Sequence, residues 1–168
     1  MARRMDGQMD VVTGLVRSSY LVNAVYAQSA RALGLPPQQG QLLCVLMPQP
    51  YPMSELGAIL GLAKSSLTGL VDRTARRGLV RRETCQHDAR AVMVALTEEG
   101  AALAEEFYQG TRRRIDALLD DLSGAERTAL AELLGRVVET NRVPVVFLEP
   151  DGEPAPAGDR HRVPNSSA

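Results

Sequence analysis

The feature that most constrains this chain is the order of short segments between residues 56 and 100, LGAILGLAKSSLTGLVDRTARRGLVRRETCQHDARAVMVALTEEG. Apolar residues at helical spacing predict two helices joined by a turn at Gly61. Two runs at strand period then predict a hairpin, after which Thr97 caps a new helix. The expected elements are helices over 54–60 and 63–77, strands over 79–84 and 91–96, and a hairpin tip at 86–90. This order is typical of a winged helix-turn-helix.

The helix expected over 63–77 has two different faces. Its apolar positions recur at i, i+3, i+4 and i+7, and they are Leu67, Leu70, Val71 and, less strongly, Thr74. The opposite face carries short polar or small residues, namely Lys64, Ser65, Thr68, Gly69 and Asp72. In a winged helix-turn-helix the second helix enters the DNA major groove, where such side chains can lie close against base edges and phosphates. This helix is therefore the candidate recognition helix.

The charge of the chain is distributed unevenly. The formal net charge is −1, but residues 64–90 contain seven basic and three acidic residues, a net charge of +4, which leaves −5 for the rest. A basic segment in an otherwise acidic chain indicates local contact with a polyanion. The basic residues are Lys64, Arg73, Arg76, Arg77, Arg81, Arg82 and Arg90, and the acids are Asp72, Glu83 and Asp88.

Helical runs flank this segment on both sides. A helix is expected over 11–33, with Gly34 at its C-cap, and another over 37–47, followed by a rigid or extended piece, PQPYPM, at 48–53. After Thr97 a long helical run reaches about residue 121, and Ser123 and Glu126 have capping-box spacing before a last helix with a broad apolar stripe over 125–138. The expected fold is mainly helical (α+β).

The length of 168 residues suits one domain with an extension. We expect a winged-helix domain over 9–142, with a DNA-binding lobe at about 37–97 and longer helices at about 9–33 and 98–142. Residues 143–168 form a C-terminal extension. From about residue 150 its Pro, Gly and Ala content predicts disorder.

Composition argues against several other classes of protein. The N-terminus has no apolar signal core and no run is long enough for a membrane span, so we expect a cytoplasmic location and no membrane partner. No nucleophile–base set, paired carboxylates or phosphate-cradling glycine loop indicates an enzyme, and no cofactor is expected. Cys44 lies in the apolar run LLCVL and is expected to be buried.

The hairpin tip leaves a redox or metal-responsive alternative open. Cys85 lies near Arg81, Arg82 and His87, which can lower the pKa of a thiol. Cys85, His87 and Asp88 are three candidate metal ligands, but three ligands on one hairpin do not complete a closed tetrahedral site. We therefore assign no metal site.

The chain resembles the MarR family of bacterial transcription regulators over about residues 15–138. Each matching piece is short, but their order and spacing are specific. They are LGAILGL at 56–62, SSLTGLVDR at 65–73, RRGLVRR at 76–82, DAR at 88–90 and VALTEEG at 94–100. The resemblance implies a winged-helix protomer that forms a homodimer through its first and last helices, which would use the apolar stripes there.

The resemblance also assigns roles to residues. It implies that Lys64, Ser65, Ser66 and Thr68 contact bases or phosphates, with Arg73 nearer the DNA backbone. Arg90 matches the wing arginine that family members place in the minor groove, where the negative potential favours a guanidinium, and Asp88 matches the acid that braces it. The chain departs from the family at Ala89, where a basic residue is usual, and at Gly69, where a larger polar or basic residue is frequent.

The mechanism that the resemblance implies is a ligand-responsive repressor. Two recognition helices would read half-sites of a pseudo-palindromic operator about one helical turn apart. A small aromatic or amphipathic effector, bound between the dimerisation helices and the DNA lobe, would release DNA by shifting the population of conformations. Candidate lining residues are Tyr20, Tyr26, Tyr51 and Tyr108. The alternative from another class is a winged-helix protein-interaction module without DNA binding, which Gly69 and Ala89 slightly favour.

Overall fold

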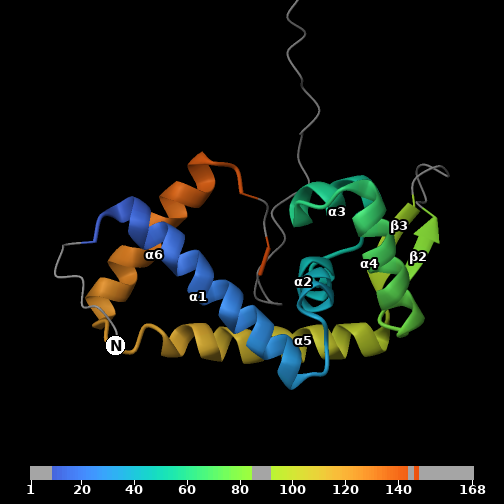
Figure 1. Cartoon of the computed structure of the whole chain (residues 1–168), viewed down its shortest axis with the longest axis horizontal. Coiled ribbons are helices and arrows are strands. Elements are labelled where there is room, and N and C mark those ends of the chain that lie inside the picture. The colour runs from blue at the N-terminus through green and yellow to red at the C-terminus, as the bar shows by residue number, and fades with distance from the viewer. Residues whose placement is uncertain (1–8, 85–91, 144–145, 148–168) are drawn as a thin grey trace, which may run out of the picture.

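The structure is a computed structural model that describes residues 9–84, 92–143 and 146–147. Its helices and strands follow one another in the predicted order (Figure 1). They are α1 (Val11–Ala32), α2 (Pro37–Leu46), β1 (Tyr51–Pro52), α3 (Met53–Leu60), α4 (Lys64–Arg76), β2 (Val80–Thr84), β3 (Val92–Leu96), α5 (Glu98–Ala117) and α6 (Gly124–Thr140). The mainly helical winged-helix fold is thus confirmed.

The helix ends form as the local sequence predicts. The Thr97 hydroxyl accepts a hydrogen bond from the Gly100 backbone N–H at 3.0 Å, which satisfies one of the unpaired donors of the first turn of α5. Gly34 and Gly61 have φ of +62° and +63°, a left-handed conformation that glycine adopts without steric cost. The long helix expected to run to about residue 121 is shorter, because α5 ends at Ala117 and turns lead into α6.

The sheet is small and antiparallel, with strand order β1-β3-β2. Val80 lies opposite Leu96, and Thr84 lies opposite Val92. The proline-rich piece that was expected to be a loop or short extended segment supplies β1, whose Tyr51 lies opposite Val94. Pro52 is tolerated there because β1 is an edge strand, where a missing N–H does not break the ladder.

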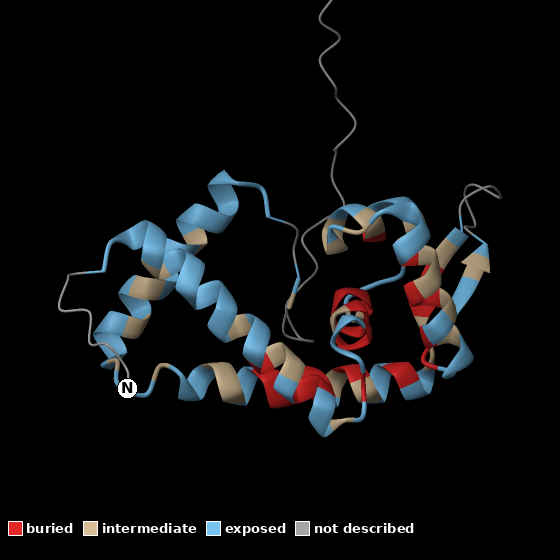
Figure 2. Cartoon of the chain, viewed as in Figure 1, coloured by how far each residue is buried: buried red, intermediate tan, exposed pale blue. Residues whose placement is uncertain are grey.

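The core lies where α2 meets α5, α4 and the sheet (Figure 2). Because α2 is packed on several sides, its residues from Gln39 to Leu46 are nearly all buried, Cys44 among them as expected. Phe107 of α5 lies directly against this helix. A Cβ added at Gly40 would lie 2.6 Å from Cε2 of Phe107, so a glycine is needed for this close approach.

The end of the molecule formed by the first half of α1 and by α6 buries little (Figure 2). None of the residues of α6 is buried. Large apolar side chains are exposed on both helices, namely Val11, Val12, Leu15, Val16, Tyr20 and Leu21 on α1, and Leu133, Leu134, Val137 and Val138 on α6. A grouping of this kind in a chain viewed alone marks an interaction surface.

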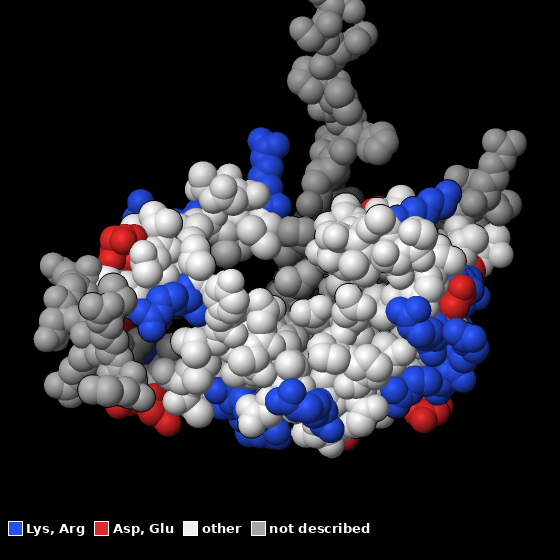
Figure 3. Space-filling view, viewed as in Figure 1, with Lys and Arg blue, Asp and Glu red and all other residues white. Residues whose placement is uncertain are grey.

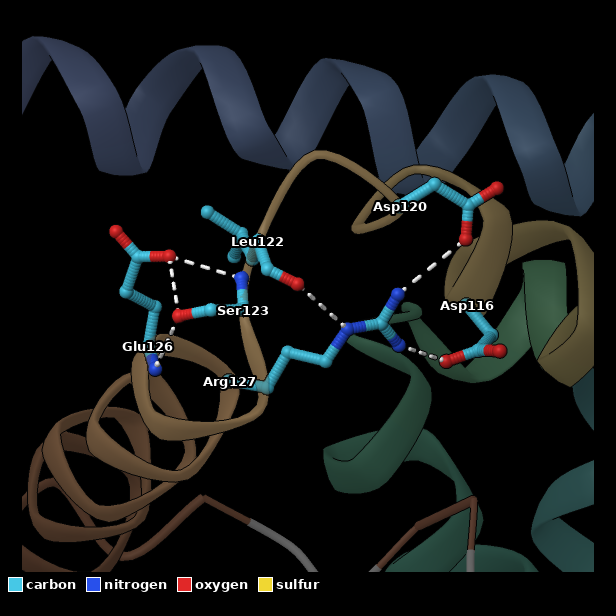
Figure 4. A network of polar contacts seen from close by, with 6 residues as sticks. All are labelled: Asp116, Asp120, Leu122, Ser123, Glu126 and Arg127. Atoms are coloured by element: carbon cyan, nitrogen blue, oxygen red, sulfur yellow. Dashed lines mark hydrogen bonds and ion pairs between the residues drawn. The ribbon is translucent and has the colours of Figure 1, made fainter.

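A polar network joins α5 to α6 (Figure 4). The Arg127 guanidinium lies 2.6 Å from an oxygen of Asp116 and 3.3 Å from one of Asp120, and its Nε donates to the Leu122 carbonyl. The predicted capping box is confirmed: Ser123 accepts from the Glu126 N–H, and the Glu126 carboxylate accepts from the Ser123 N–H at 2.8 Å. These bonds define how α6 leaves the end of α5.

None of the helices in the described parts of the chain combines the length and the apolar character that a bilayer crossing requires.

Candidate nucleic-acid interface

Helix α4 is fixed by its apolar face. Leu67, Leu70, Val71 and Thr74 are buried, as the spacing predicts. The Thr74 hydroxyl donates to the Leu70 carbonyl at 2.8 Å, so the one polar group on this face is satisfied inside its own helix. Burying this stripe against the core turns the other side of α4 outward.

The outward side of α4 carries the residues predicted to contact DNA. Lys64, Ser65 and Ser66 are exposed, and Thr68 is half-buried. The Thr68 hydroxyl donates to the Lys64 carbonyl at 2.8 Å, which leaves its lone pairs available to accept. The structure therefore brings these predicted residues together on the first turns of one helix.

The start of α4 has no side-chain cap. Ala63 is the N-cap residue and cannot accept a hydrogen bond. The first intrahelical bond runs from the Leu67 N–H to the Ala63 carbonyl, so the N–H groups of the first turn have no partner within the helix. Together with the helix dipole and the Lys64 ammonium, these donors favour an anion such as a phosphate.

Gly69 leaves space for the side chain of Arg73, one turn further along α4. The Arg73 side chain folds back along the helix, and its Nη1 would lie only 3.1 Å from a Cβ at position 69. The absence of a side chain at Gly69 thus makes room for a guanidinium one turn closer to the start of α4. The Arg73 guanidinium thus takes part of the space that a larger polar or basic side chain at position 69 would fill in other family members.

Other arginines of the basic segment have partners inside the protein. Arg77 donates to the Gly34 carbonyl and to the Gln39 side chain, Arg82 pairs with Asp72 at 2.7 Å, and Arg81 binds Glu83 and the Leu96 carbonyl. Among the described residues no acid pairs with Lys64, Arg73 or Arg76. Lys and Arg side chains gather at the end of the molecule formed by α4 and β2 (Figure 3).

A hollow of about 790 Å³ opens between α3, α4 and the strands. Lys64, Thr68 and Arg82 line it on the α4 and β2 side, and Met53 and Val92 provide apolar walls. Sequence reasoning did not identify Met53 or Val92 as part of this surface, because they come from segments that are separated from α4 along the chain. The polar side of the hollow is continuous with the outward side of α4.

The predicted wing residues Asp88 and Arg90 lie outside the described residues, as do Cys85, His87 and Ala89. Their roles stay predictions. In the parts of the chain that the structure describes, no group of three or more His, Cys, Asp or Glu residues could hold a metal ion.

The start of α5 is locked to the hairpin. The Thr97 N–H donates to the Leu79 carbonyl at 3.1 Å, and the Thr97 hydroxyl donates to the Gly78 carbonyl at 2.6 Å. A Cβ at Gly100 would lie 1.8 Å from the Leu79 carbonyl oxygen, so no other residue fits there. The TEEG sequence thus joins the hairpin base rigidly to the helix that leads out of the lobe.

The four tyrosines expected to line an effector site lie in three different surroundings. Tyr20 points outward from α1 and is 73% exposed, and Tyr51 packs against the core from β1. Tyr26 and Tyr108 belong to an aromatic cluster with Phe107 and Phe147. The structure therefore brings two of the four tyrosines into one cluster, and it adds two phenylalanines that sequence reasoning did not select.

Two weak acids, Tyr26 in this cluster and the buried Cys44, have raised pKa values. Burial raises the pKa of the Cys44 thiol to about 12, with a further contribution from the charge of Glu105. Burial also raises the pKa of Tyr26 to about 12, with a smaller contribution from Cys44. A thiol in this state is a weak nucleophile at neutral pH, so Cys44 acts as a packing residue.

The fold and the outward side of α4 define a winged helix-turn-helix protein of the DNA-binding type. The MarR family model matches residues 33–91. The transcriptional repressor NicR of Pseudomonas putida is 30% identical over 129 residues, which are 76% of this chain and 82% of NicR. The chain belongs to the MarR family.

A second curated relative and two solved structures are also similar to this chain. The transcriptional repressor YetL of Bacillus subtilis is 34% identical over 86 residues, which are 51% of this chain and 52% of YetL; the chain thus matches about half the length of that relative. Apo MarR of E. coli superposes with a TM-score of 0.70 at 24% identity, covering 79% of this chain and 99% of MarR. BpsR of Bordetella bronchiseptica, whose DNA binding is regulated by 6-hydroxynicotinic acid, superposes with a TM-score of 0.64 at 24% identity, covering 83% and 99%.

Proposed function

We propose that this protein is a homodimeric transcriptional repressor that binds a pseudo-palindromic operator and releases it when a small aromatic or amphipathic effector binds. The functional unit is the winged-helix domain over 9–142. The observation that carries the proposal is the outward side of α4, where Lys64, Ser65, Ser66 and Thr68 surround unpaired first-turn N–H groups. The proposal involves no catalytic step, and a repressor of this kind works in the bacterial cytoplasm.

Some of the basic residues have partners inside the protein and others do not, and this difference supports DNA binding. Lys64 and Arg73 are exposed and have no acidic partner among the described residues, so their charges are available to phosphates. Arg77 instead donates to the Gly34 carbonyl, in the turn between α1 and α2, and to the Gln39 side chain on α2. We assign Lys64, Ser65, Ser66 and Thr68 to bases or phosphates, Arg73 to the DNA backbone, and Arg90, braced by Asp88, to the minor groove.

The exposed apolar surface of α1 and α6 supports a homodimer. These helices leave ten large apolar side chains at least 43% exposed, and α6 contributes nothing to the core of its own protomer. A second copy of the chain brings the same surface, so a two-fold axis would pair the two sets. The dimer then places two α4 helices at a separation suited to two half-sites.

The effector part of the proposal rests on the aromatic cluster of Tyr26, Phe107, Tyr108 and Phe147, which joins α1 to α5. A ligand bound beside these rings would alter the angle between the dimerisation helices and the lobe. The DNA binding of BpsR, whose fold this chain shares, is regulated by 6-hydroxynicotinic acid. A planar aromatic acid is therefore the class of effector that we infer.

The experiment that tests DNA binding is a fluorescence-anisotropy titration of DNA from upstream of the gene at several salt concentrations. Each phosphate contact contributes about −0.9 to the slope of log K against log salt. We expect Lys64→Ala, which removes one contact from each protomer of the dimer, to weaken binding at least about tenfold and to reduce the slope by about 1.8. Arg113→Ala, which removes an exposed arginine from α5, is the charge-matched control. Equal affinity of wild type and Lys64→Ala, or no binding at low salt, would contradict the proposal and favour a protein-interaction module.

A further inference from the structure

Phe147 returns to the body of the protein after α6. Its ring centroid lies 4.6 Å from that of Tyr108 on α5 and 5.9 Å from that of Tyr26 on α1. In Figure 1 the short piece of chain that contains it lies between α1 and α2. Val143 and Val146 are exposed, but Phe147 packs against the hydrophobic core. The contact therefore belongs to this one side chain.

The backbone at Phe147 indicates that packing holds the ring in place. Its φ is +60°, a left-handed conformation that bulky residues rarely adopt. Both ring contacts are inclined, with interplanar angles of 61° to Tyr26 and 49° to Tyr108, and offset or edge-on arrangements are those that aromatic pairs prefer. The space between Tyr26 and Tyr108 thus accommodates one aromatic ring, and the Phe147 ring occupies it.

We propose that Phe147 is the chain's own occupant of the effector site between Tyr26 and Tyr108, and that an aromatic acid enters the site by displacing it. The inference rests on the proposed function, which supplies the effector. If Phe147 leaves, the rings of Tyr26, Phe107 and Tyr108 border an apolar space of the kind that takes up a benzene-sized molecule. The Phe147 side chain then acts as an internal competitor that sets the effector concentration needed for release.

The polar groups beside the cluster select an acid. The Tyr26 and Tyr108 hydroxyls lie on rings that flank Phe147. Arg112 donates to the Tyr108 hydroxyl at 3.4 Å, which places a guanidinium charge at the edge of the cluster. A ring that carries a carboxylate could replace the Phe147 ring and accept a hydrogen bond from the Tyr108 hydroxyl. A neutral hydrocarbon ring would make no such bond.

Calorimetric titration with benzoate tests the competition. If a site is open in only a fraction of the molecules, its apparent affinity is the intrinsic affinity multiplied by that fraction. We expect Phe147→Ala to bind benzoate at least about tenfold more tightly than wild type, as for a site open in about one molecule in ten, and Phe147→Leu to lie between them. Val146→Ala, a change at the exposed neighbour, should match wild type. Equal affinity of Phe147→Ala and wild type, or no binding by either, would overturn the proposal.

Fluorescence tests the position of the ring directly, because the chain contains no Trp. The Phe147→Trp variant should emit at shorter wavelength than Val146→Trp, and saturating benzoate should move its emission to longer wavelength. Identical emission of the two variants, or no change with bound benzoate, would also overturn the proposal. Operator binding by the ligand-free wild type and variants is measured in parallel. If the wild type does not bind the operator but the benzoate pattern is intact, the proposed function alone is wrong. If the wild type binds the operator but the benzoate pattern is missing, the Phe147 proposal alone is wrong.

Discussion

At the scale of single residues, Gly69 and Arg73 form a pair on the outward side of α4. A methyl group at position 69 would crowd Arg73 Nη1, which would lie 3.1 Å away. Gly69→Ala should raise the stability of the helix, by up to about 1 kcal/mol from propensity, but should weaken operator binding because Arg73 is displaced. The measurement is a comparison of thermal unfolding and anisotropy titrations.

A double-mutant cycle shows whether the effect of Gly69→Ala passes through Arg73. In the Arg73→Gln background, Gly69→Ala should leave DNA affinity unchanged, since the side chain that it displaces is no longer charged. An undiminished effect of Gly69→Ala in that background would contradict the role given to the pair.

Cys44 and Tyr26 make stability depend on alkaline pH. In the folded protein the pKa of each is raised to about 12, from 9.0 for the thiol and 10.0 for the phenol. The unfolded chain therefore loses its protons first as the pH rises, so the stability is complete below about pH 9 and decreases toward pH 12. Chemical denaturation between pH 8 and 11, in a Cys85→Ser background, measures this dependence.

The control for this pH dependence is a pair of conservative replacements. Tyr26→Phe should reduce the loss of stability above about pH 10, since it removes a group that titrates. Cys44→Ala should likewise reduce the loss of stability above about pH 9, since it removes the buried thiol. A flat profile in the Cys85→Ser protein would show that neither Cys44 nor Tyr26 is held neutral by the fold.

At the scale of elements, the α5–α6 junction depends on its capping box more than on its ion pairs. Arg127, Asp116 and Asp120 have side chains that are 32%, 67% and 75% exposed, and exposed pairs contribute little. Ser123→Ala should lower the free energy of unfolding by about 1 kcal/mol. Arg127→Ala should cost less than about 1 kcal/mol. Denaturant melts of both variants measure this order, and a larger effect of Arg127→Ala would reverse the ranking.

The sequence predicts elements well where their causes are local. Thr97, Ser123 and Gly61 act on backbone groups within a few residues, and the stripe of Leu67, Leu70 and Val71 is visible as spacing alone. All of these predictions are confirmed. The number and order of helices and the identity of α4 as a two-faced helix therefore follow from the sequence.

Contacts between distant segments could not be predicted in this way. Arg77 looked like part of a basic DNA-contacting run, but it binds Gly34 and Gln39 some forty positions earlier. Phe147 contacts Tyr26, which lies 121 positions earlier in the chain. Such pairs depend on the way the helices cross, and neither periodicity nor composition carries that information.

At the scale of the whole molecule, the apolar surface of α1 and α6 should hold two protomers together. Leu133 is 57% exposed on α6. Leu133→Glu would bury a charge in that interface, which is costly, so we expect monomers in sedimentation experiments and a loss of operator affinity, since one lobe alone reads one half-site. Val92→Glu, at an exposed position in the lobe, should stay dimeric. A dimeric Leu133→Glu protein would show that α6 is outside the interface.

The central claim is that two copies of α4 read two half-sites of one operator, and hydroxyl-radical footprinting on the upstream DNA tests it most directly. We predict two protected half-sites related by a pseudo-two-fold axis and centred about 10 base pairs, or one helical turn, apart. At a protein concentration that just saturates the wild-type footprint, the Lys64→Ala variant should show weaker protection of both half-sites together. A single protected patch, or no protection at low salt with a correctly folded protein, would contradict the account.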